Sequence, residues 1–595
     1  MKTNINLAAV VHRSAFADCC PINSDEVKVC LHTGKEVTKV NLIYNDPFIE
    51  HVAPGKEWYG ITQACAAEYE LAYNFIWTCT VKPQYKRFQY YFEIISSTEK
   101  VYFFEDGFYS SSELAVMKNF SFFDMPWINP SDVISGPSWV QKTVWYEIYP
   151  DRFCSAGNQY KRLKNRSWGD ETNMSWTDFY GGDIRGIISR LDYLQELGIT
   201  GIYLTPVFES PSNHKYDTTD YTKIDPDFGT EDDMVELSSE LHQRGMRIMI
   251  DAVFNHCGAS FKPWLDVTEK GSDSEFLDWF FVNKFPVLTD DKKTDDGRYY
   301  SFSFEAGMPK LNTGNPQTAE YLISICRHWV SDWHIDGIRM DVGDEISHSF
   351  IKLLRKELKA LNPDLFLLGE IWHDSIQWLQ GDEYDSVMNY PLLAAVDNFW
   401  DRGTGTAEDL RQALNGITAM YSVQTERMLF NFLDTHDTIR AFSKCRTPGM
   451  FFQKFVLMLT LQGSFCLYYG TEAGLKGASP YNRGCMPWNL IDSGSCGDIR
   501  RETAELIKLR KSYPQFYSPH IEWFPAGSDT NSRLIHYGKY SDDTMNPSRI
   551  EVYMQTGTGG IRIGLCGNET ILYRRKFSDG MLDSEGILIV LKKDS

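Results

Sequence analysis

The sequence lacks the features that mark membrane, secreted and zinc-binding proteins. None of its apolar runs reaches the length of a membrane span, and the run Leu7–Val11 is too short for the core of a secretion signal. The 13 cysteines include no CxxC pair and no zinc-like spacing, and their odd number does not suit a disulfide framework. We therefore expect reduced thiols, no bound metal, no membrane association and a cytoplasmic location.

Positive charge is also scarce. The formal net charge is −21, whereas proteins that bind nucleic acid need a basic surface, and anionic membranes repel an acidic one. The charge therefore argues against nucleic acid and membrane surfaces as partners, but it leaves neutral polymers open. Aromatic residues are plentiful, with 16 Trp, 32 Tyr and 36 Phe. Flat rings stack on the apolar faces of sugars, although most such rings fill protein cores.

The two ends of the chain predict β domains, and 595 residues are too many for one core. Residues 1–130 contain short alternating runs, such as Glu26–Leu31 and Gln89–Ile95, separated by turn residues and without a long helical period. They predict an N-terminal β-sandwich. Residues 513–595 predict a C-terminal β-sandwich from the runs Ser532–Tyr537, Ile550–Met554 and Ile587–Leu591.

Between these domains, residues 131–512 alternate apolar strands with amphipathic helices. The expected strands are Thr143–Pro150, Ile199–Val207, Met246–Phe254, Gly337–Val342, Leu365–Ile371, Ser386–Tyr390, Met428–Leu433 and Phe465–Tyr469. The expected helices include Asp183–Leu197, Glu231–Gln243, Ala319–Trp333 and Phe350–Leu361. This alternation predicts a parallel sheet, and eight units predict a closed (β/α)8 TIM barrel. The long irregular stretch at about 257–312 is then a small subdomain inserted after the third strand.

Charged residues stand at the ends of the predicted barrel strands, where barrel enzymes place their reactive groups. The fourth strand ends in Arg339 and Asp341, the fifth in Glu370, and the seventh in His436 and Asp437. Three carboxylates that converge above the barrel axis serve no purpose in a core, because like charges repel and lose solvation. Glycoside hydrolysis does need a pair of carboxyl groups, one of them kept protonated. The pattern therefore predicts a glycosidase that retains the anomeric configuration.

Asp341 suits the nucleophile that attacks the sugar. Arg339 lies two positions earlier on the same strand, so the two side chains share a face and the fixed charge of Arg339 is expected to keep Asp341 ionised. Asp437 suits a group that hydrogen-bonds the hydroxyls of the distorted sugar. His256, at the end of the third strand, and His436 are expected to be neutral hydrogen-bond donors to the same sugar.

Glu370 suits the general acid and base. Its neighbours Leu367, Leu368 and Ile371 predict an apolar surrounding. Such a surrounding, together with nearby carboxylates, favours the protonated form that a general acid needs.

Four strings of the sequence resemble motifs of the α-amylase family, glycoside hydrolase family thirteen. They are DAVFNH at Asp251–His256, GIRMDV at Gly337–Val342, GEIW at Gly369–Trp372 and FLDTHD at Phe432–Asp437, which follow the family's order through the whole barrel. The resemblance implies an α-glucan hydrolase with nucleophile Asp341, acid/base Glu370 and transition-state stabiliser Asp437.

The same resemblance assigns residues that bind the reacting sugar. Arg339, His256 and His436 match the family's binding residues at that position. The string HKYDTTDY places Tyr216 as the ring that stacks on the sugar, with His214 close by.

Further strings are similar to signatures of the neopullulanase, cyclomaltodextrinase and maltogenic amylase group. They are MPKLN at Met308–Asn312 and GEIWHDSIQWLQGDEYDSVMNY at Gly369–Tyr390. The N-terminal domain, with VHR near its start and NLIYNDPF at Asn41–Phe48, resembles that group's starch-binding-type module. The resemblance implies a homodimer in which the module covers the partner's active site and narrows the cleft for short or cyclic glucans. Trp372 then flanks the acceptor side, where it biases the choice between water and sugar.

Two departures from the family pattern bear on the site. The stretch where many relatives bind calcium reads Phe153–Gln159 here and is short of carboxylates. One carboxylate, Asp183, rarely holds Ca2+, which takes six to eight oxygens, so we expect no cofactor; calcium stays open as an alternative that the sequence does not favour. Before the late PMxW-like string, Arg483 is present as a substrate-binding residue, but Ser479 stands where the family often has Asp.

The sequence thus predicts hydrolysis of α-1,4-glucosidic bonds in cyclodextrins, maltooligosaccharides or pullulan, with transfer to sugar acceptors as a second outcome. Two alternatives stay open. One is α-1,6 debranching or another glucosyl transfer of the family, against which MPKLN counts weakly. The other is a barrel without chemistry that serves as a glucan-binding scaffold, against which the complete set of acids, Arg339 and both histidines counts strongly.

Overall fold

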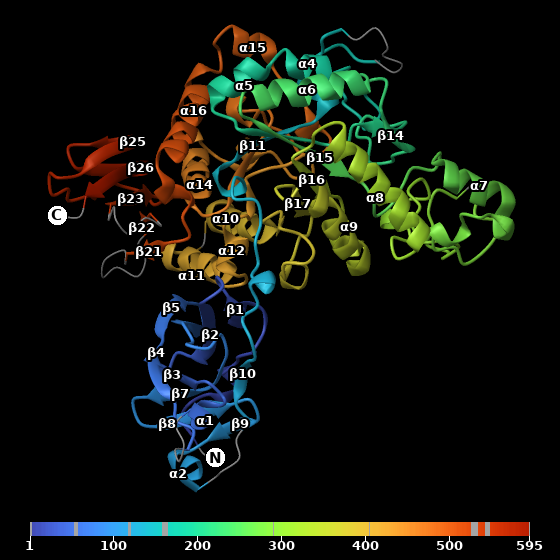
Figure 1. Cartoon of the computed structure of the whole chain (residues 1–595). Helices are drawn as coiled ribbons and strands as arrows, with labels where there is room; N and C mark the ends of the chain where they lie inside the picture. The colour runs from blue at the N-terminus through green and yellow to red at the C-terminus, as the bar shows by residue number, and fades with distance from the viewer. Residues whose placement is uncertain are drawn as a thin grey trace. The chain divides into compact units, whose positions relative to one another are not determined.

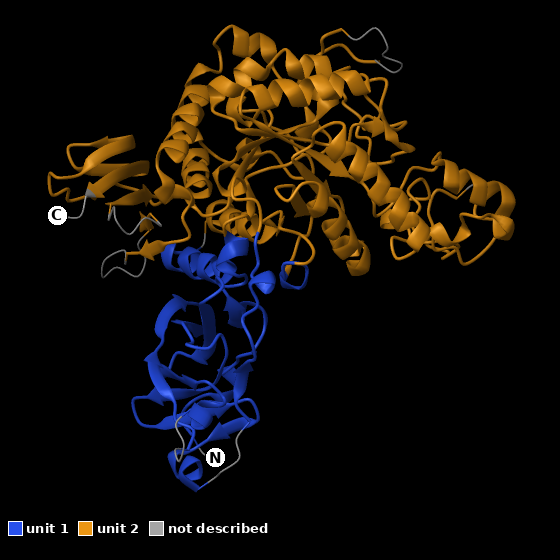
Figure 2. Cartoon of the chain, viewed as in Figure 1, with its two compact units in different colours: residues 1–135, 376–381, 404–426 blue, residues 136–375, 382–403, 427–595 orange. Residues whose placement is uncertain are grey.

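The computed structural model describes residues 3–52, 57–116, 121–157, 165–288, 291–403, 405–524, 533–541 and 548–593. The chain forms two compact units (Figure 2). The first unit contains Met1–Ser135 together with Ile376–Gly381 and Thr404–Glu426. The second unit contains Gly136–Ser375, Asp382–Gly403 and Arg427–Ser595. Among the described residues, no helix is both long and apolar enough to span a bilayer.

The first unit is built on two antiparallel sheets (Figure 1). One sheet has the order β1 (Cys19–Pro21), β2 (Val27–Gly34), β6 (Asn74–Val81) and β5 (Ala66–Glu70). The other has the order β4 (Ile61–Ala64), β3 (Val37–Asn45), β7 (Phe88–Ser96), β8 (Lys100–Phe104) and β9 (Gly107–Tyr109), with β10 (Phe123–Met125) beside β7. Burial alternates residue by residue along β7, as in a strand with one face on a core. The predicted N-terminal β-sandwich is confirmed.

A helix from a distant part of the sequence also belongs to the first unit. It is α11 (Ala407–Thr418), which begins with a capping box between Thr406 and Asp409 and packs against β5. Asn415 donates a hydrogen bond to the Glu70 carbonyl at 3.0 Å, and Arg411 pairs with the Glu70 carboxylate at 2.7 Å.

The second unit contains the predicted barrel. Its parallel strands, in spatial order, are β18 (Ser386–Val387), β17 (Phe366–Gly369), β16 (Gly337–Met340), β15 (Arg247–Ala252), β12 (Gly201–Leu204), β11 (Val144–Ile148), β20 (Ser464–Tyr468) and β19 (Phe430–Phe432). A parallel bridge between Met388 and Phe430 closes the sheet into a ring. All eight predicted strands are therefore present, and the TIM barrel is confirmed.

Helices cover the outside of the barrel (Figure 1). They include α4 (Ile184–Ile188), α5 (Leu191–Leu197), α6 (Glu231–Gln243), α8 (Pro316–Ser331), α9 (His348–Leu361), α10 (Tyr390–Arg402), α14 (Pro448–Thr460) and α16 (Gly497–Ser512). The single helix expected at Asp183–Leu197 is divided into α4 and α5. The Ser189 hydroxyl bonds back to the Gly186 carbonyl at 2.7 Å where α4 ends, and Gly198 terminates α5 with a left-handed φ of 96°.

The insert after β15 and the C-terminal domain complete the second unit. The insert begins with α7 (Lys262–Lys270), and Trp264 packs against the rings of Phe280 and Tyr299. The C-terminal domain is all-β, as predicted. Its described strands form one antiparallel sheet of β21 (Ile521–Trp523), β22 (Leu534–Tyr540), β23 (Ser548–Gln555), β24 (Ile561–Arg562), β25 (Thr570–Ser578) and β26 (Met581–Lys593). Ser532, the start of one expected run, lies outside the described residues.

Candidate active site

A cavity of about 640 Å³ opens at the carboxyl ends of the barrel strands. It is lined by Trp176, His214, Tyr216, His256, Phe302, Met308, Asp341, Val342, Asp344, Glu345, Glu370, Trp372, Asp437 and Arg483. The three acids expected to act on the sugar all face this space. This is the location that the barrel topology predicts, because the ends of parallel strands meet on one face.

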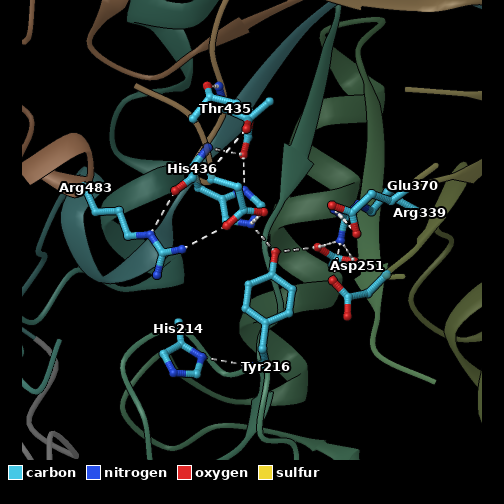
Figure 3. Close-up of polar contacts among 12 residues, drawn as sticks. His214, Tyr216, Asp251, Arg339, Glu370, Thr435, His436 and Arg483 are labelled. Carbon is cyan, nitrogen blue, oxygen red and sulfur yellow. Dashed lines mark hydrogen bonds and ion pairs between the residues drawn. The ribbon is translucent and has the colours of Figure 1, made fainter. Parts of the chain in front are cut away.

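Arg339 is the charged centre of the cavity floor (Figure 3). Its side chain is fully buried, and its Nη1 lies 2.9 Å from Asp251 and 2.9 Å from Asp341 Oδ1. Its Nη2 lies 2.9 Å from Glu370 Oε2. One flat guanidinium therefore fixes three carboxyl groups that come from three neighbouring strands.

The proton balance of this cluster differs from the sequence-based expectation. Burial and the Glu370 carboxylate raise the pKa of Asp341 well above its usual range, and Arg339 opposes this only in part. The expectation that the fixed charge of Arg339 keeps Asp341 ionised is wrong, because this single charge is shared among three buried acids. The raised pKa means that Asp341 resists ionisation in this site more than an exposed aspartate does.

Glu370 is held by an ion pair with Arg339 and by two hydrogen-bond donors. Besides Arg339, the Val342 backbone N–H donates to Oε2 at 2.9 Å, and the Trp372 indole N–H donates to Oε1 at 3.1 Å. Val342 adopts φ 47° and ψ 51°, a left-handed conformation that a β-branched residue rarely takes. In this conformation the Val342 N–H donates its hydrogen bond to Glu370. Strained backbone of this kind is common at functional sites.

Trp372 is also fixed by stacking. Its ring lies 3.7 Å from that of Tyr390 with an interplanar angle of 13°. The side chain nevertheless remains 52% exposed at the cavity rim. Trp372 therefore has a fixed position beside Glu370, and part of its ring is still exposed to a ligand in the cavity.

His436 forms a second charged centre, again contrary to expectation. Its Nδ1 lies 2.6 Å from Glu147 Oε1, and its Nε2 lies 3.0 Å from Asp437 Oδ2. Burial by itself lowers the pKa of His436, but Asp437 and Glu147 outweigh it and raise that pKa to about 10. The neutral donor expected from the sequence is wrong here, because the imidazole lies between two carboxylates and is protonated at neutral pH.

Asp437 is the opposite case. Burial favours its neutral form, but His436 and Arg483 overcome this and hold the pKa of Asp437 well below its usual range. The Arg483 Nη2 donates to Asp437 Oδ1 at 3.0 Å, and its Nε donates to the His436 carbonyl at 3.0 Å. Asp437 is thus an ionised hydrogen-bond acceptor at the cavity wall at neutral pH.

Tyr216 joins the two charged centres (Figure 3). Its hydroxyl lies 2.6 Å from His436 Nε2 and donates to Asp251 Oδ2 at 2.9 Å. Its ring stacks on that of His436 at 5.3 Å, and its backbone N–H donates to His214 Nδ1 at 3.1 Å. The phenol ring faces the cavity in a fixed orientation, as a stacking surface requires.

His256 and His214 do remain neutral. Burial lowers the pKa of His256 to about 3 and that of His214 to about 4. The His256 ring stacks on Phe302 at 4.8 Å, and its Nε2 lies 3.1 Å from the Tyr216 carbonyl. The expectation of a neutral imidazole is confirmed for His256.

The structure brings all ten predicted site residues together. Eight of them line the cavity, whereas Arg339 and His436 lie behind it and act through their carboxylate partners.

Sequence reasoning missed Glu147 and Trp176. A signal existed for Glu147, since it is a charged residue inside the apolar strand β11, but none existed for Trp176, which lies in an irregular loop.

The stretch considered for calcium is only partly described, since Asn158 and Gln159 lie outside the described residues. The Asp183 carboxylate accepts hydrogen bonds from the Gly186 N–H at 2.6 Å and the Ala156 N–H at 3.2 Å. It therefore caps α4 and joins that helix to the loop after β11.

Comparisons with known proteins agree with this geometry. The family model "Alpha amylase, catalytic domain" matches residues 147–508, and "Alpha amylase, N-terminal ig-like domain" matches residues 5–129. A cyclomaltodextrinase of Geobacillus thermopakistaniensis (strain MAS1) is 38% identical over 88% of this chain and 87% of its own. A neopullulanase 2 of Thermoactinomyces vulgaris is 37% identical over 88% of each chain.

Two further matches extend these findings. A protein of Bacillus subtilis (strain 168) named intracellular maltogenic amylase is 37% identical over 87% of this chain and 86% of its own. The solved structure of a cyclomaltodextrinase superposes with a TM-score of 0.86 at 31% identity, covering 99% of this chain and 98% of that one. With the carboxylates and the barrel in place, these matches show that the chain belongs to the α-amylase family of glycoside hydrolases.

Proposed function

We propose that the protein hydrolyses α-glucosidic bonds by double displacement at the Arg339 cluster. The observation that carries this proposal is the position of Asp341 and Glu370, which both lie 2.9 Å from the Arg339 guanidinium and both face the cavity. Retaining glycosidases need two carboxyl groups placed on either side of one bond.

The steps follow from the contacts of the two acids. In this mechanism Glu370 is the protonated acid, and it transfers its proton to the glycosidic oxygen as the bond to carbon breaks. Asp341, then ionised and paired with Arg339, bonds to the anomeric carbon. Water next attacks this ester-like intermediate, and Glu370 takes its proton, which restores the starting state.

The remaining predicted residues bind and orient the sugar in this proposal. Asp437, ionised by its neighbours, accepts hydrogen bonds from hydroxyls that strengthen as the ring flattens. Tyr216 stacks on the ring, while His214, His256 and Arg483 lie within the same cavity wall. Arg339 and His436 set the charge of the acids, and Trp372 flanks the acceptor.

We propose α-1,4 bonds of cyclodextrins, maltooligosaccharides and pullulan as the substrates, with sugar transfer as a second outcome. The names of three relatives, cyclomaltodextrinase, maltogenic amylase and neopullulanase, support this class. The half-exposed Trp372 beside Glu370 supports sugar binding on the acceptor side, because an apolar ring there disfavours water.

The partner and the location are proposals as well. We propose a homodimer in which the N-terminal domain narrows the partner's cleft, as the resemblance of its sequence to a starch-binding-type module suggests. We propose that the protein works in the cytoplasm. All 13 cysteines are described and unpaired, as in a reducing compartment, and one relative is named as intracellular.

Substitution Asp341→Asn tests the mechanism. It removes the attacking carboxylate while preserving size and hydrogen bonding, so the rate of sugar release from β-cyclodextrin should fall by about three orders of magnitude or more. Reducing-sugar assays measure this, and circular dichroism checks that the fold is retained. If the wild-type protein is inert on cyclodextrin, pullulan, starch and maltotriose, the proposed hydrolase activity is refuted. If pullulan is converted to panose, the cleaved bond is the α-1,4 bond.

The charge of His436 predicts a pH-dependent contribution to stability. Its pKa is raised to about 10 in the folded protein from an ordinary value of 6.5, so the protonated imidazole stabilises the fold fully below pH 6.5 and loses this effect as pH rises toward 10. Substitution His436→Gln should lower the unfolding free energy by about 3 kcal/mol near pH 6.5, because the buried Glu147 and the neighbouring Asp437 lose their cation. The deficit should shrink by pH 10.

Calorimetry of wild type and variant between pH 6 and 10 measures this difference. His51→Gln, at a side chain 69% exposed, is the matched control and should leave the melting temperature unchanged. A deficit that is the same at every pH would show that His436 is neutral in the folded protein.

Light scattering tests the dimer. At micromolar concentration the measured mass should be twice the 68.5 kDa of one chain. Removal of residues 1–130 should then give a monomeric mass if the domain supplies the interface. A full-length species of one-chain mass alone would contradict the proposed covering of the partner's cleft.

A further inference from the structure

Two tryptophans at the cavity rim are both about half exposed. Trp176 is 51% exposed and Trp372 is 52% exposed, and both line the cavity. A large apolar ring that stays half open to water beside a binding cavity offers a flat surface to a ligand. The proposed function already assigns Trp372 to the acceptor side, beside the acid/base Glu370. It assigns no role to Trp176.

The contacts of the two rings place them on opposite sides of the reacting bond. Trp372 donates to Glu370, the group that protonates the leaving oxygen, and so belongs to the acceptor side. The Arg483 guanidinium lies 4.7 Å from the Trp176 ring and donates to Asp437 at 3.0 Å. Because Asp437 faces the sugar that the enzyme retains, Trp176 belongs to the donor side.

The backbone around Trp176 is anchored rather than loose. Asn213 Nδ2 donates to the Trp176 carbonyl at 2.9 Å and to the Asp178 carbonyl at 2.7 Å. The Tyr149 hydroxyl holds Asn213 at 2.7 Å, and Arg152 donates to the Asp178 carbonyl at 2.7 Å. A ring on a fixed loop loses little conformational freedom when a ligand covers it, which favours binding.

We propose that Trp176 is the stacking platform for the second sugar on the donor side, adjacent to the sugar that Asp341 attacks. Arg483 supports the ring through its cation–π contact and contributes hydrogen-bond donors nearby. The substrate class favoured by this platform is an α-glucan with at least two sugars on the non-reducing side of the cleaved bond. The inference rests on the proposed function, since it names a substrate contact of the same site.

Two chromogenic substrates isolate this contact. The p-nitrophenyl α-maltoside and α-glucoside share the nitrophenyl leaving group and the reacting sugar, and they differ only in the second donor sugar. Nitrophenol release by the full-length enzyme should favour the maltoside. Trp176→Ala should lower kcat/KM for the maltoside about 10-fold or more, mainly through KM, and leave the glucoside within about 2-fold.

Matched variants separate stacking from structural damage. Trp176→Phe keeps a flat ring and should retain most of the preference. Tyr300→Ala removes an aromatic ring that is 60% exposed but does not line the cavity, and it should change neither rate. Equal losses on both substrates, or no loss on either, would overturn the assignment of Trp176. A wild-type enzyme that releases nitrophenol from neither substrate would instead refute the proposed hydrolysis.

Discussion

The contact of one buried guanidinium with three carboxyl groups is the constraint on which the site depends. Arg339 leaves water completely and is compensated by Asp251, Asp341 and Glu370, each 2.9 Å away. Removing one partner of such a buried group leaves uncompensated charge, at a cost of about 3–5 kcal/mol. A lysine would not replace it, because only the planar fork of arginine reaches several acids at once. The same contact aims Asp341 and Glu370 at one point of the cavity.

The second centre uses the same principle, with a protonated histidine in place of the arginine. His436 is a cation between Glu147 and Asp437, and its charge helps to keep Asp437 ionised at the cavity wall. Tyr216 connects His436 to Asp251, which binds Arg339. The acids on both sides of the reacting sugar therefore belong to one hydrogen-bonded network, so a change of charge at one end alters proton affinity at the other.

The fold and the positions of the acids could be predicted because both are encoded locally. Apolar strands alternate with amphipathic helices, and in a barrel the residue that ends a strand faces the site. The protonation states of Asp341 and His436 could not be predicted in this way. The charge of His436 depends on Glu147, which lies 289 residues earlier in the sequence, and the raised pKa of Asp341 comes from burial that only the folded chain provides. Trp176 lies in an irregular loop, where no periodicity marks a binding residue.

The central claim is that Asp341 attacks the sugar while Glu370 carries the proton. Its most direct test is incubation with 5-fluoro-α-maltosyl fluoride, whose good leaving group speeds the first displacement while the ring fluorine slows the second. Digestion and mass spectrometry then locate the bound sugar. The account predicts a maltosyl ester on the Asp341 side chain. A label on Glu370 or Asp437, or turnover of the reagent to a product of inverted configuration without any label, would contradict it.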